Sequence, residues 1–414
     1  MSESFSFFVG IDLGSEQHHI EVINEQGGNA GRRAVDHGGA AVTEFLHWLA
    51  QLTSVVAPPE VAVAVEAPRG ALIDALLERG YAVFSINPKQ LDRFRDRFSV
   101  AGAKDDRRDA LVLAQSLRTD GEHFRRLRAD DPRIVRVREL SRGEQSLQQD
   151  LRRACNQLWN YLQRYFPAVL QLSSSADEPW LWDLLRRCQA LPTRAARFRP
   201  ETIASLLRRH HIRRLTAEQV HLALREPLPL APGVAEALAE QVLTLLPRLQ
   251  LLRQQRLDLS QRVEQLIEEL TADENFAEHR SLAILRSLPG VGRVSAAAVL
   301  AEAFTPLAEK DYRSLRALAG VAPVTKQSGK TRLVSMRRAC DNRLRCALFH
   351  AANVHMQKDE RARRIYHRLR QCGNSHARAL RGVADRLLEL LCTLLRKQSL
   401  YDPAKRLIQQ QVPA

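Results

Sequence analysis

The feature that most constrains the fold is a long apolar register in the middle of the chain. Apolar residues recur there at steps of four and three, interrupted only by Arg256, at Leu245, Leu249, Leu252, Leu259, Val263, Leu266 and Leu270. An earlier run alternates steps of seven and four, at Leu140, Leu147, Leu151, Leu158 and Leu162. Such spacing keeps the side chains on one seam of a helix, so we expect two long helices.

We expect these helices to pair as an antiparallel coiled-coil arm whose tip is the segment 167–232. The tip is rich in Pro, Arg and Trp, with Trp180 and Trp182 close together. The register is compatible with an arm that packs only against itself and with one that dimerises the protein. For the whole protein we expect a homo-oligomer, either a dimer or a tetramer.

Ahead of the arm, the chain has the pattern of a mixed α/β domain. The expected strands are Ser6–Leu13, His18–Asn24, Arg32–Asp36, Val61–Val65 and Ala82–Ile86, and the expected helices are Ala41–Leu52, Gly70–Arg79 and Asp105–Leu117. Turn signals between the first three strands predict a meander. The later succession of strand, helix and strand implies a parallel crossover.

Positive charge is concentrated behind the arm. The formal net charge of the chain is +15, and residues 281–414 alone hold 25 Lys and Arg against 9 Asp and Glu. This region has no basic amphipathic helix rich in Trp or Phe, so nucleic acid is a better partner for it than an anionic membrane. A surface that only improves solubility is the plainer alternative.

Length indicates two or three domains, because 414 residues exceed one ordinary compact domain. The patterns along the chain divide it into three, at 1–125, 126–280 and 281–414. The expected fold class is α/β plus α, with a helical C-terminal domain. The chain has no run of about twenty apolar residues and no signal-peptide pattern. Its six cysteines have no CxxC spacing and are expected to be reduced. These features predict a cytoplasmic protein without a membrane partner.

Four carboxylates stand where a metal site can form. Asp12 ends the first strand, Glu66 ends the strand Val61–Val65, and Asp106 and Asp109 are three residues apart on the next helix. Carboxylates that converge on one sheet edge need a hard cation, and Mg²⁺ prefers oxygen ligands. We therefore expect Mg²⁺, or Mn²⁺, as cofactor. The segment Gly10-Ile11-Asp12-Leu13-Gly14 also fits actin-like ATPases, but the second glycine-rich phosphate loop of those proteins is missing.

Two glycine-containing segments of the basic region are candidates for contacts with nucleic acid. Leu288-Pro289-Gly290-Val291-Gly292 looks like a helix-hairpin-helix turn, whose backbone N–H groups can approach a phosphate. A tight turn between two helices is an equally good interpretation. Ser328-Gly329, between Lys326 and Lys330, would by itself be an ordinary turn.

The ordered carboxylates and the Ser-Gly segment together resemble the DEDD transposases of insertion sequences, the IS-one-ten type, which include the Piv-like DNA invertases. The resemblance covers both ends of the chain and leaves the middle unmatched in detail. It implies a RuvC-like ribonuclease-H fold for the first domain, with Asp12, Glu66, Asp106 and Asp109 as its tetrad. The family usually has Thr or Ser where this chain has Asp105. Asp105 is therefore a rival for Asp106, although spacing favours Asp106.

The same resemblance gives a role to the C-terminal domain. In the family, a G-[LV]-x-P segment leads to a Ser-Gly with the nucleophile and then to an LR-x-x-L helix, which match Gly320–Pro323, Ser328 and Asn342–Leu348. The resemblance implies that Ser328 joins the acidic metal site and that double-stranded donor and target DNA are joined through a phosphoserine intermediate. It further implies a structured noncoding bridge RNA that pairs with both DNAs.

Basic side chains around the serine are expected to hold phosphates. These residues are Lys326, Lys330, Arg332, Arg337, Arg338, Arg343, Arg345, Arg361, Arg364 and Arg368, of which the last three share one helical face. Alternative functions are a Holliday-junction-type metal-dependent endonuclease that uses water as nucleophile and a Piv-like site-specific invertase. An architectural nucleic-acid-binding protein with an inactive nuclease fold is a further alternative, but the retention of all four carboxylates argues against it.

Overall fold

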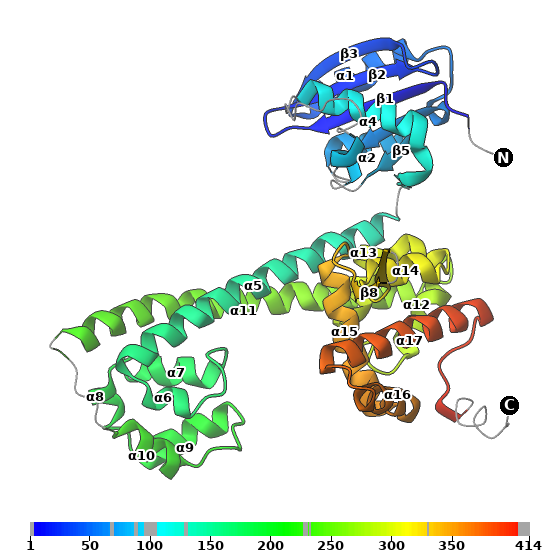
Figure 1. Ribbon diagram of the computed structural model, residues 1–414. Coiled ribbons are helices and arrows are strands. Elements are labelled where there is room, and N and C mark those ends of the chain that lie inside the picture. Colours follow the sequence, from blue (N-terminus) through cyan, green and yellow to red (C-terminus); the bar gives the residue numbers. More distant parts are fainter. Residues whose placement is uncertain are drawn as a thin grey trace. The chain divides into compact units, whose positions relative to one another are not determined.

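A computed structural model describes residues 4–66, 70–86, 90–94, 106–127, 131–226, 231, 233–328 and 331–404. The chain divides into two compact units, Met1–Asp131 and Pro132–Ala414 (Figure 1). The arm and the basic region therefore belong to one unit, and the three-domain division stays a prediction. Within the described ranges, no helix combines the length and the apolar character that a membrane span requires.

The described residues of the first unit form a mixed sheet with strand order β3-β2-β1-β4-β5-β6. Its strands are β1 (Phe7–Leu13), β2 (Gln17–Asn24), β3 (Asn29–Asp36), β4 (Val61–Val65), β5 (Ala82–Ser85) and β6 (Arg125–Arg126). The meander β1–β3 is antiparallel, and β4 runs parallel to both β1 and β5. The expected meander and parallel crossover are thus confirmed, whereas β6 was not expected.

Helices cover both faces of this sheet. One core joins Val9 and Ile11 of β1 to buried side chains of α1 (Gly39–Leu52) and α2 (Ala71–Glu78). A second core joins the opposite sheet face, including Phe8, to α4 (Asp106–Asp120). The alternation of Phe8 and Val9 between the two cores follows from the period of two along a strand. Two short 3₁₀ turns, η1 (Pro58–Glu60) and η2 (Gly121–His123), also belong to this unit.

The second unit is organised around an arm of two long helices, α5 (Pro132–Tyr165) and α11 (Val234–Ala272). They lie side by side and run in opposite directions (Figure 1), so the arm packs against itself within one chain. Its two ends belong to separate hydrophobic cores. Between the cores, Leu147 and Leu259 are only half-buried. At each end of the arm, further helices pack against the seam and bury it. In the middle, the two helices have no such cover and leave the seam partly exposed.

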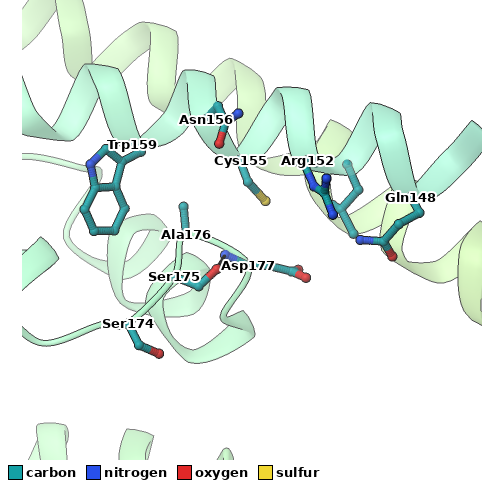
Figure 2. Close-up of a pocket in the computed structure, with 10 residues that line it drawn as sticks. Gln148, Arg152, Cys155, Asn156, Trp159, Ser174, Ser175, Ala176 and Asp177 are labelled. Carbon is teal, nitrogen blue, oxygen red and sulfur yellow. Dashed lines mark hydrogen bonds between the residues drawn. The ribbon is translucent and has the colours of Figure 1, made fainter. Parts of the chain in front are cut away.

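The tip of the arm is a small helical subdomain. It contains α6 (Ala168–Gln171), α7 (Pro179–Arg187), α8 (Pro192–Ala195), α9 (Pro200–Arg209) and α10 (Ala217–Leu224). Trp180 and Trp182 fill its core with less than 2% of their surface exposed, which gives the tryptophans singled out in the sequence a packing role. A cavity opens between α5 and the loop that precedes α7 (Figure 2).

The base of the arm packs into the basic C-terminal region. Its elements are α12 (His279–Ser287), α13 (Arg293–Ala308), α14 (Tyr312–Leu318), β7 (Pro323–Ser328), β8 (Thr331–Met336), α15 (Asn342–Lys358), α16 (Glu360–Gln371) and α17 (His376–Lys397). The expectation of a wholly helical region is wrong at β7 and β8, which pair as an antiparallel hairpin. Both strands contain Thr and Val, residue types that favour strand over helix.

Candidate active site

Asp12 and Glu66 lie at the same edge of the sheet. β1 and β4 are parallel neighbours with Ile11 opposite Val65, and each carboxylate residue comes one position later. Ile11 and Val65 both belong to the core on the α1 and α2 side. Because side chains alternate along a strand, the next residue on each strand belongs to the opposite face, which α4 covers. The two strand-end carboxylates therefore share the α4 side of the sheet.

A glycine in β1 brings α4 onto this edge. A Cβ atom on Gly10 would lie 1.8 Å from the carbonyl oxygen of Ala110 and 2.7 Å from the amide nitrogen of Ala114. The backbone of α4 thus rests directly on β1, a contact that only glycine permits. Asp109, next to Ala110, is buried with 4% of its surface exposed. Close packing therefore brings Asp109 to the strand that carries Asp12.

The carboxylate oxygens of this region suit a hard cation such as Mg²⁺. Asp106 begins α4, one turn before Asp109, but its side chain and all of Asp105 lie outside the residues that the structure describes. Among the described side chains, no three His, Cys, Asp or Glu form a group that could hold one metal ion. Mg²⁺ in proteins usually keeps several waters and is held by one or two carboxylates together with substrate phosphates.

Ser328 lies in entirely different surroundings. It is the last residue of β7, opposite Thr331 of β8, and its side chain is exposed. Neighbouring Leu333 and Val334, which point to opposite faces of β8, are 59% and 43% exposed. Within the described part of the second unit, both faces of this hairpin are uncovered. An uncovered apolar hairpin is typical of a surface that contacts another molecule.

The base of the hairpin is fixed by the segment that precedes it. Gly320 follows α14 with φ +65°, and a Cβ atom there would lie 2.7 Å from the Sγ atom of Cys340. The amides of Val321 and Ala322 both donate to the carbonyl of Arg316, at 3.1 Å. This geometry explains why the G-[LV]-x-P motif begins with glycine, because the chain reverses at Gly320 and leaves no room for a side chain.

The basic residues expected to bind phosphates differ in exposure. Arg361, Arg364 and Arg368 are exposed on α16, and Arg364 has a carboxylate nearby, Glu360 at 3.8 Å. Arg338 is exposed as well, whereas Arg337 and Arg345 are half-buried. The side chains of Lys326 and Arg332, together with all of Lys330, lie outside the described residues.

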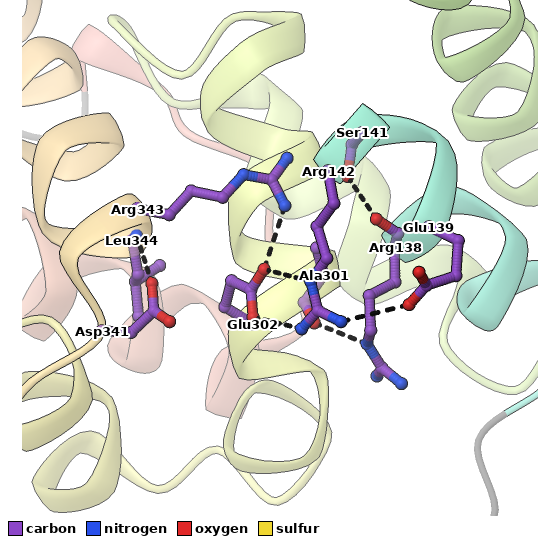
Figure 3. Close-up of polar contacts among 9 residues, drawn as sticks. All are labelled: Arg138, Glu139, Ser141, Arg142, Ala301, Glu302, Asp341, Arg343 and Leu344. Atoms are coloured by element: carbon purple, nitrogen blue, oxygen red, sulfur yellow. Dashed lines mark hydrogen bonds and ion pairs between the residues drawn. The ribbon is translucent and has the colours of Figure 1, made fainter. Parts of the chain in front are cut away.

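Arg343 faces inward, toward a buried carboxylate that the sequence reasoning missed. Its guanidinium donates to Glu302 Oε1 at 3.0 Å, and Arg142 of α5 binds the same carboxylate through Nε at 3.0 Å and Nη2 at 2.7 Å (Figure 3). This pairing occupies the group that we expected to hold a phosphate. A lone Glu among the small apolar residues 295–303 was the available signal for a buried ion pair.

The ion pairs of Glu302 connect three helices. Its side chain comes from α13 and is only 7% exposed, while its arginine partners come from α5 and α15. Burial alone would raise the pKa of this carboxyl, but the hydrogen bonds and charges of Arg142 and Arg343 outweigh burial and hold the pKa below its usual value. The carboxylate therefore remains ionised and anchors the helix that follows the serine hairpin to the arm.

The turn at Leu288–Gly292 has a structural explanation for one of its glycines. Gly290 has φ +95°, and a Cβ atom there would lie 2.3 Å from the carbonyl oxygen of Ala351 in α15. His355 Nδ1 lies 2.9 Å from the carbonyl oxygen of Pro289. Gly290 thus serves the packing of the turn against α15. Gly292, in contrast, has open space around it at the start of α13.

The chain is similar to transposases of insertion sequences. Residues 9–167 match a DEDD IS110-type family model described as "Transposase", and residues 282–367 match one described as "Transposase IS116/IS110/IS902 family". The mini-circle protein for IS117 of Streptomyces coelicolor, named as a transposase, is 31% identical over 97% of this chain and 96% of its own length.

Other relatives are similar to parts or all of the chain. A protein of Sinorhizobium fredii that is named as a transposase is 44% identical over 52% of this chain, and the match spans 60% of that relative. The 43.6 kDa protein of insertion element IS110 from Streptomyces coelicolor is 26% identical over 97% of this chain and 96% of its own length.

Proposed function

Because this chain belongs to the IS110 (IS-one-ten) family of transposases, we propose that it is a recombinase that cuts and rejoins double-stranded DNA for an insertion sequence. The observation that carries the proposal is the close contact of α4 with β1 at Gly10, which supports a position of Asp109 beside the strand of Asp12, whose neighbouring strand leads to Glu66. The strand order of the first unit supports a RuvC-like fold for it.

In this proposal, the acidic residues Asp12, Glu66, Asp106 and Asp109 would hold Mg²⁺ or Mn²⁺. A bound divalent ion would stabilise charge on the oxygens of a scissile phosphodiester. Asp12 and Glu66, at the ends of neighbouring strands, would supply ligands from a rigid sheet. Buried Asp109 would supply its ligand from the helix packed on that sheet.

Ser328 is the proposed nucleophile. Its Oγ would attack the phosphorus of a DNA phosphodiester, form a phosphoserine ester and release a DNA hydroxyl, which takes up the proton. A hydroxyl of a second DNA strand would then attack the phosphoserine, join the two DNAs and restore the serine. Such a step needs an activated hydroxyl and access to DNA. The exposure of Ser328 at the end of β7 supports the access.

The exposed arginines of the second unit would hold the DNA backbone. Arg361, Arg364 and Arg368 repeat at helical spacing on α16, so that one face of the helix can follow successive phosphates. Arg338 is exposed two residues after β8 and would add a phosphate contact near the hairpin. Arg343 is left out of the contact surface proposed here because Glu302 already binds its guanidinium.

We also propose a structured noncoding RNA as partner, following the family resemblance. The basic excess of residues 281–414 supports contacts with RNA as well as DNA, since both present phosphates. The test is to sequence the RNA that copurifies with the protein. Recovery of one structured RNA encoded beside the gene supports the proposal, and a featureless mixture contradicts it.

A homo-oligomer, a dimer or tetramer, is proposed through the arm. On α11, Leu251 and Leu257 are 58% and 38% exposed, unusual for leucines of a packed helix pair. Leu251→Glu should lower the mass measured by light scattering while the thermal melting temperature changes little. An unchanged mass would remove the arm from the interface.

The recombination reaction itself is tested with the full-length protein, Mg²⁺, donor and target DNA and the copurifying RNA. Joined junctions detected by sequencing, and lost with Asp12→Asn, support the proposed function. Cleavage without joining would assign the protein to the Holliday-junction-type endonucleases. Inversion of a segment between two sites would place it with Piv-like invertases, and the absence of any DNA processing contradicts the proposal.

A further inference from the structure

The cavity at the tip of the arm has a composition that the proposed function leaves unexplained. It has a volume of about 450 Å³ and lies between one face of α5 and the loop before α7 (Figure 2). This size is typical of sites for small ligands. Gln148, Arg152, Cys155, Asn156 and Trp159 line it from α5, at spacings that keep them on one helical face.

The loop wall of the cavity is held in place before any ligand binds. Ser173 Oγ donates to the carbonyl of Ser175 at 2.8 Å, and Ser174 Oγ donates to Glu178 at 3.0 Å. Trp182 Nε1 donates to the carbonyl of Ala176 at 2.7 Å. A wall fixed in this way lowers the entropy cost of binding.

The helix wall presents polar groups that the protein does not use. In the described part of the chain, no hydrogen bond or ion pair engages the side chains of Gln148, Arg152 or Asn156, and the last two are exposed. Neighbouring Arg153, which does not line the cavity, has a partner in Asp150. The cavity therefore collects one free guanidinium and two free amides.

Trp159 differs from the two tryptophans of the tip core. Trp180 and Trp182 are fully buried, and their indole N–H groups donate to Glu178 and Ala176. Trp159 is only half-buried, at the rim of the cavity. A partly exposed indole beside amides and a guanidinium is the set of groups with which proteins bind an unpaired base and its phosphate.

The Cys155 thiol does not make the cavity a site for covalent catalysis. Burial, together with the charge of Asp177, raises the pKa of the Cys155 thiol to about 12, although Arg253 opposes the shift. The thiol is therefore protonated at neutral pH and is a poor nucleophile. Asp177 itself is bound by Arg253 at 3.3 Å, which leaves Arg152 as the free charge of the site within the described chain.

We propose that this cavity binds one unpaired nucleotide of a nucleic-acid strand, with the base on Trp159 and the phosphate on Arg152. The inference rests on the proposed nucleic-acid function and adds to it a single-strand contact site at the other end of the arm from the serine hairpin (Figure 1). The amides of Gln148 and Asn156 would then donate to and accept from the edge of the base. An RNA loop and single-stranded DNA offer the same chemistry.

The test is photo-crosslinking of the full-length protein to short strands that carry iodouracil, one as RNA and one as DNA, at subsaturating concentration. Mass spectrometry should find an adduct on the peptide that contains Trp159 with at least one strand, and the preferred strand identifies the source. Loss of the base stack in Trp159→Ala should lower single-strand binding at this site about five- to a hundredfold, whereas Trp159→Phe should keep most of it.

Arg152→Gln and Arg153→Gln form a matched pair, since each removes one charge from adjacent exposed positions. Arg152→Gln should reduce the Trp159 adduct at least about fivefold, and Arg153→Gln should leave it within about twofold. Equal reductions, or adducts only elsewhere, would overturn the proposal. The adduct does not require strand joining, so a failure of recombination leaves this test intact. Full recombination without the adduct would overturn the proposed nucleotide site and leave the proposed function standing.

Discussion

Asp109 and Ser328, from the two candidate catalytic groups, stand in opposite surroundings. Asp109 is 4% exposed on a helix whose backbone touches β1 at Gly10. Ser328 is exposed on a two-stranded hairpin with apolar side chains uncovered on both faces. Packing within the first unit holds Asp109 in place before any substrate binds. Within the described part of its own unit, the hairpin is supported at its base, by the segment that precedes it, and not around Ser328.

This contrast indicates where each group obtains its precision. A catalytic group is useful only when its position is fixed to a fraction of an ångström. Packing fixes the acidic edge, whereas a lone two-stranded hairpin is marginally stable in water. We infer that the hairpin obtains its precision from contact with another surface, such as DNA. Substitutions should therefore cost the most folding stability at the packed edge and the least at the hairpin.

Gly10→Val should have the largest effect, because its side chain would occupy the space of the Ala110 carbonyl. Overpacking against backbone should destabilise the first unit by about 3 kcal/mol or more. Gly39→Ala is the control, since nothing lies within 4 Å of a Cβ atom at Gly39. Thermal melting should fall sharply for the first variant only. Equal melting temperatures would mean that α4 does not rest on β1.

Glu302→Gln should have the next largest effect, because it leaves the half-buried guanidinium groups of Arg142 and Arg343 without their carboxylate. Removing one partner of a buried ion pair costs about 3 kcal/mol. Glu139→Gln breaks only an exposed contact to Arg142, at 3.1 Å, and should cost less than about 1 kcal/mol. Urea unfolding measures both free energies. A small loss for Glu302→Gln would show that the network contributes little.

Acid should remove the folding stability that the Glu302 carboxylate provides. Its pKa is below the ordinary value of 4.5 in the folded protein, so its contribution is complete above that pH and is lost as the pH falls through the folded pKa. The stability difference between wild type and Glu302→Gln should therefore shrink below about pH 4.5. A difference that stays constant from neutral to low pH would contradict the ion-pair account.

Asp12→Asn should change stability little, because Asp12 is half-buried and Asn has the same shape, but it should abolish recombination. Asp109→Asn should also abolish recombination. The pair Asp105→Asn and Asp106→Asn ranks the rival ligands, and we expect the second to be the more damaging. The reverse order in the junction assay would move the ligand by one residue, and recombination by Asp12→Asn at the wild-type rate would exclude it from the site.

Sequence periodicity predicted the sheet, the crossover and both long helices, because these elements bury long apolar patterns. The pattern of Val263, Leu266 and Leu270, for example, lies in one core at the base of the arm. The hairpin escaped prediction because its strands are short and its apolar residues Leu333 and Val334 are exposed. Such a segment has no alternation between buried and solvated positions for a sequence pattern to record.

The candidate site was predictable only in part, for a similar reason. Asp12 lies near the end of one apolar strand and Glu66 directly after another, so their placement at one edge followed from the strands. The pairing of Arg343 with Glu302 depends on which helices meet in three dimensions, and no local pattern encodes it. The same holds for the contact of Gly290 with Ala351, which are far apart in sequence.

Ser328→Ala should have the smallest effect on stability and the most complete effect on chemistry, because Ser328 is exposed and its side chain has no hydrogen-bond partner in the described part of the chain. The direct measurement is to trap the reaction on a nicked DNA substrate, separate the products on a denaturing gel and map the modified peptide. We predict a DNA adduct on Ser328 in the wild type. Ser328→Ala should bind DNA and melt like the wild type, yet form neither adduct nor joined product. An adduct on another residue, or strand cleavage by Ser328→Ala at the wild-type rate, would contradict the serine mechanism.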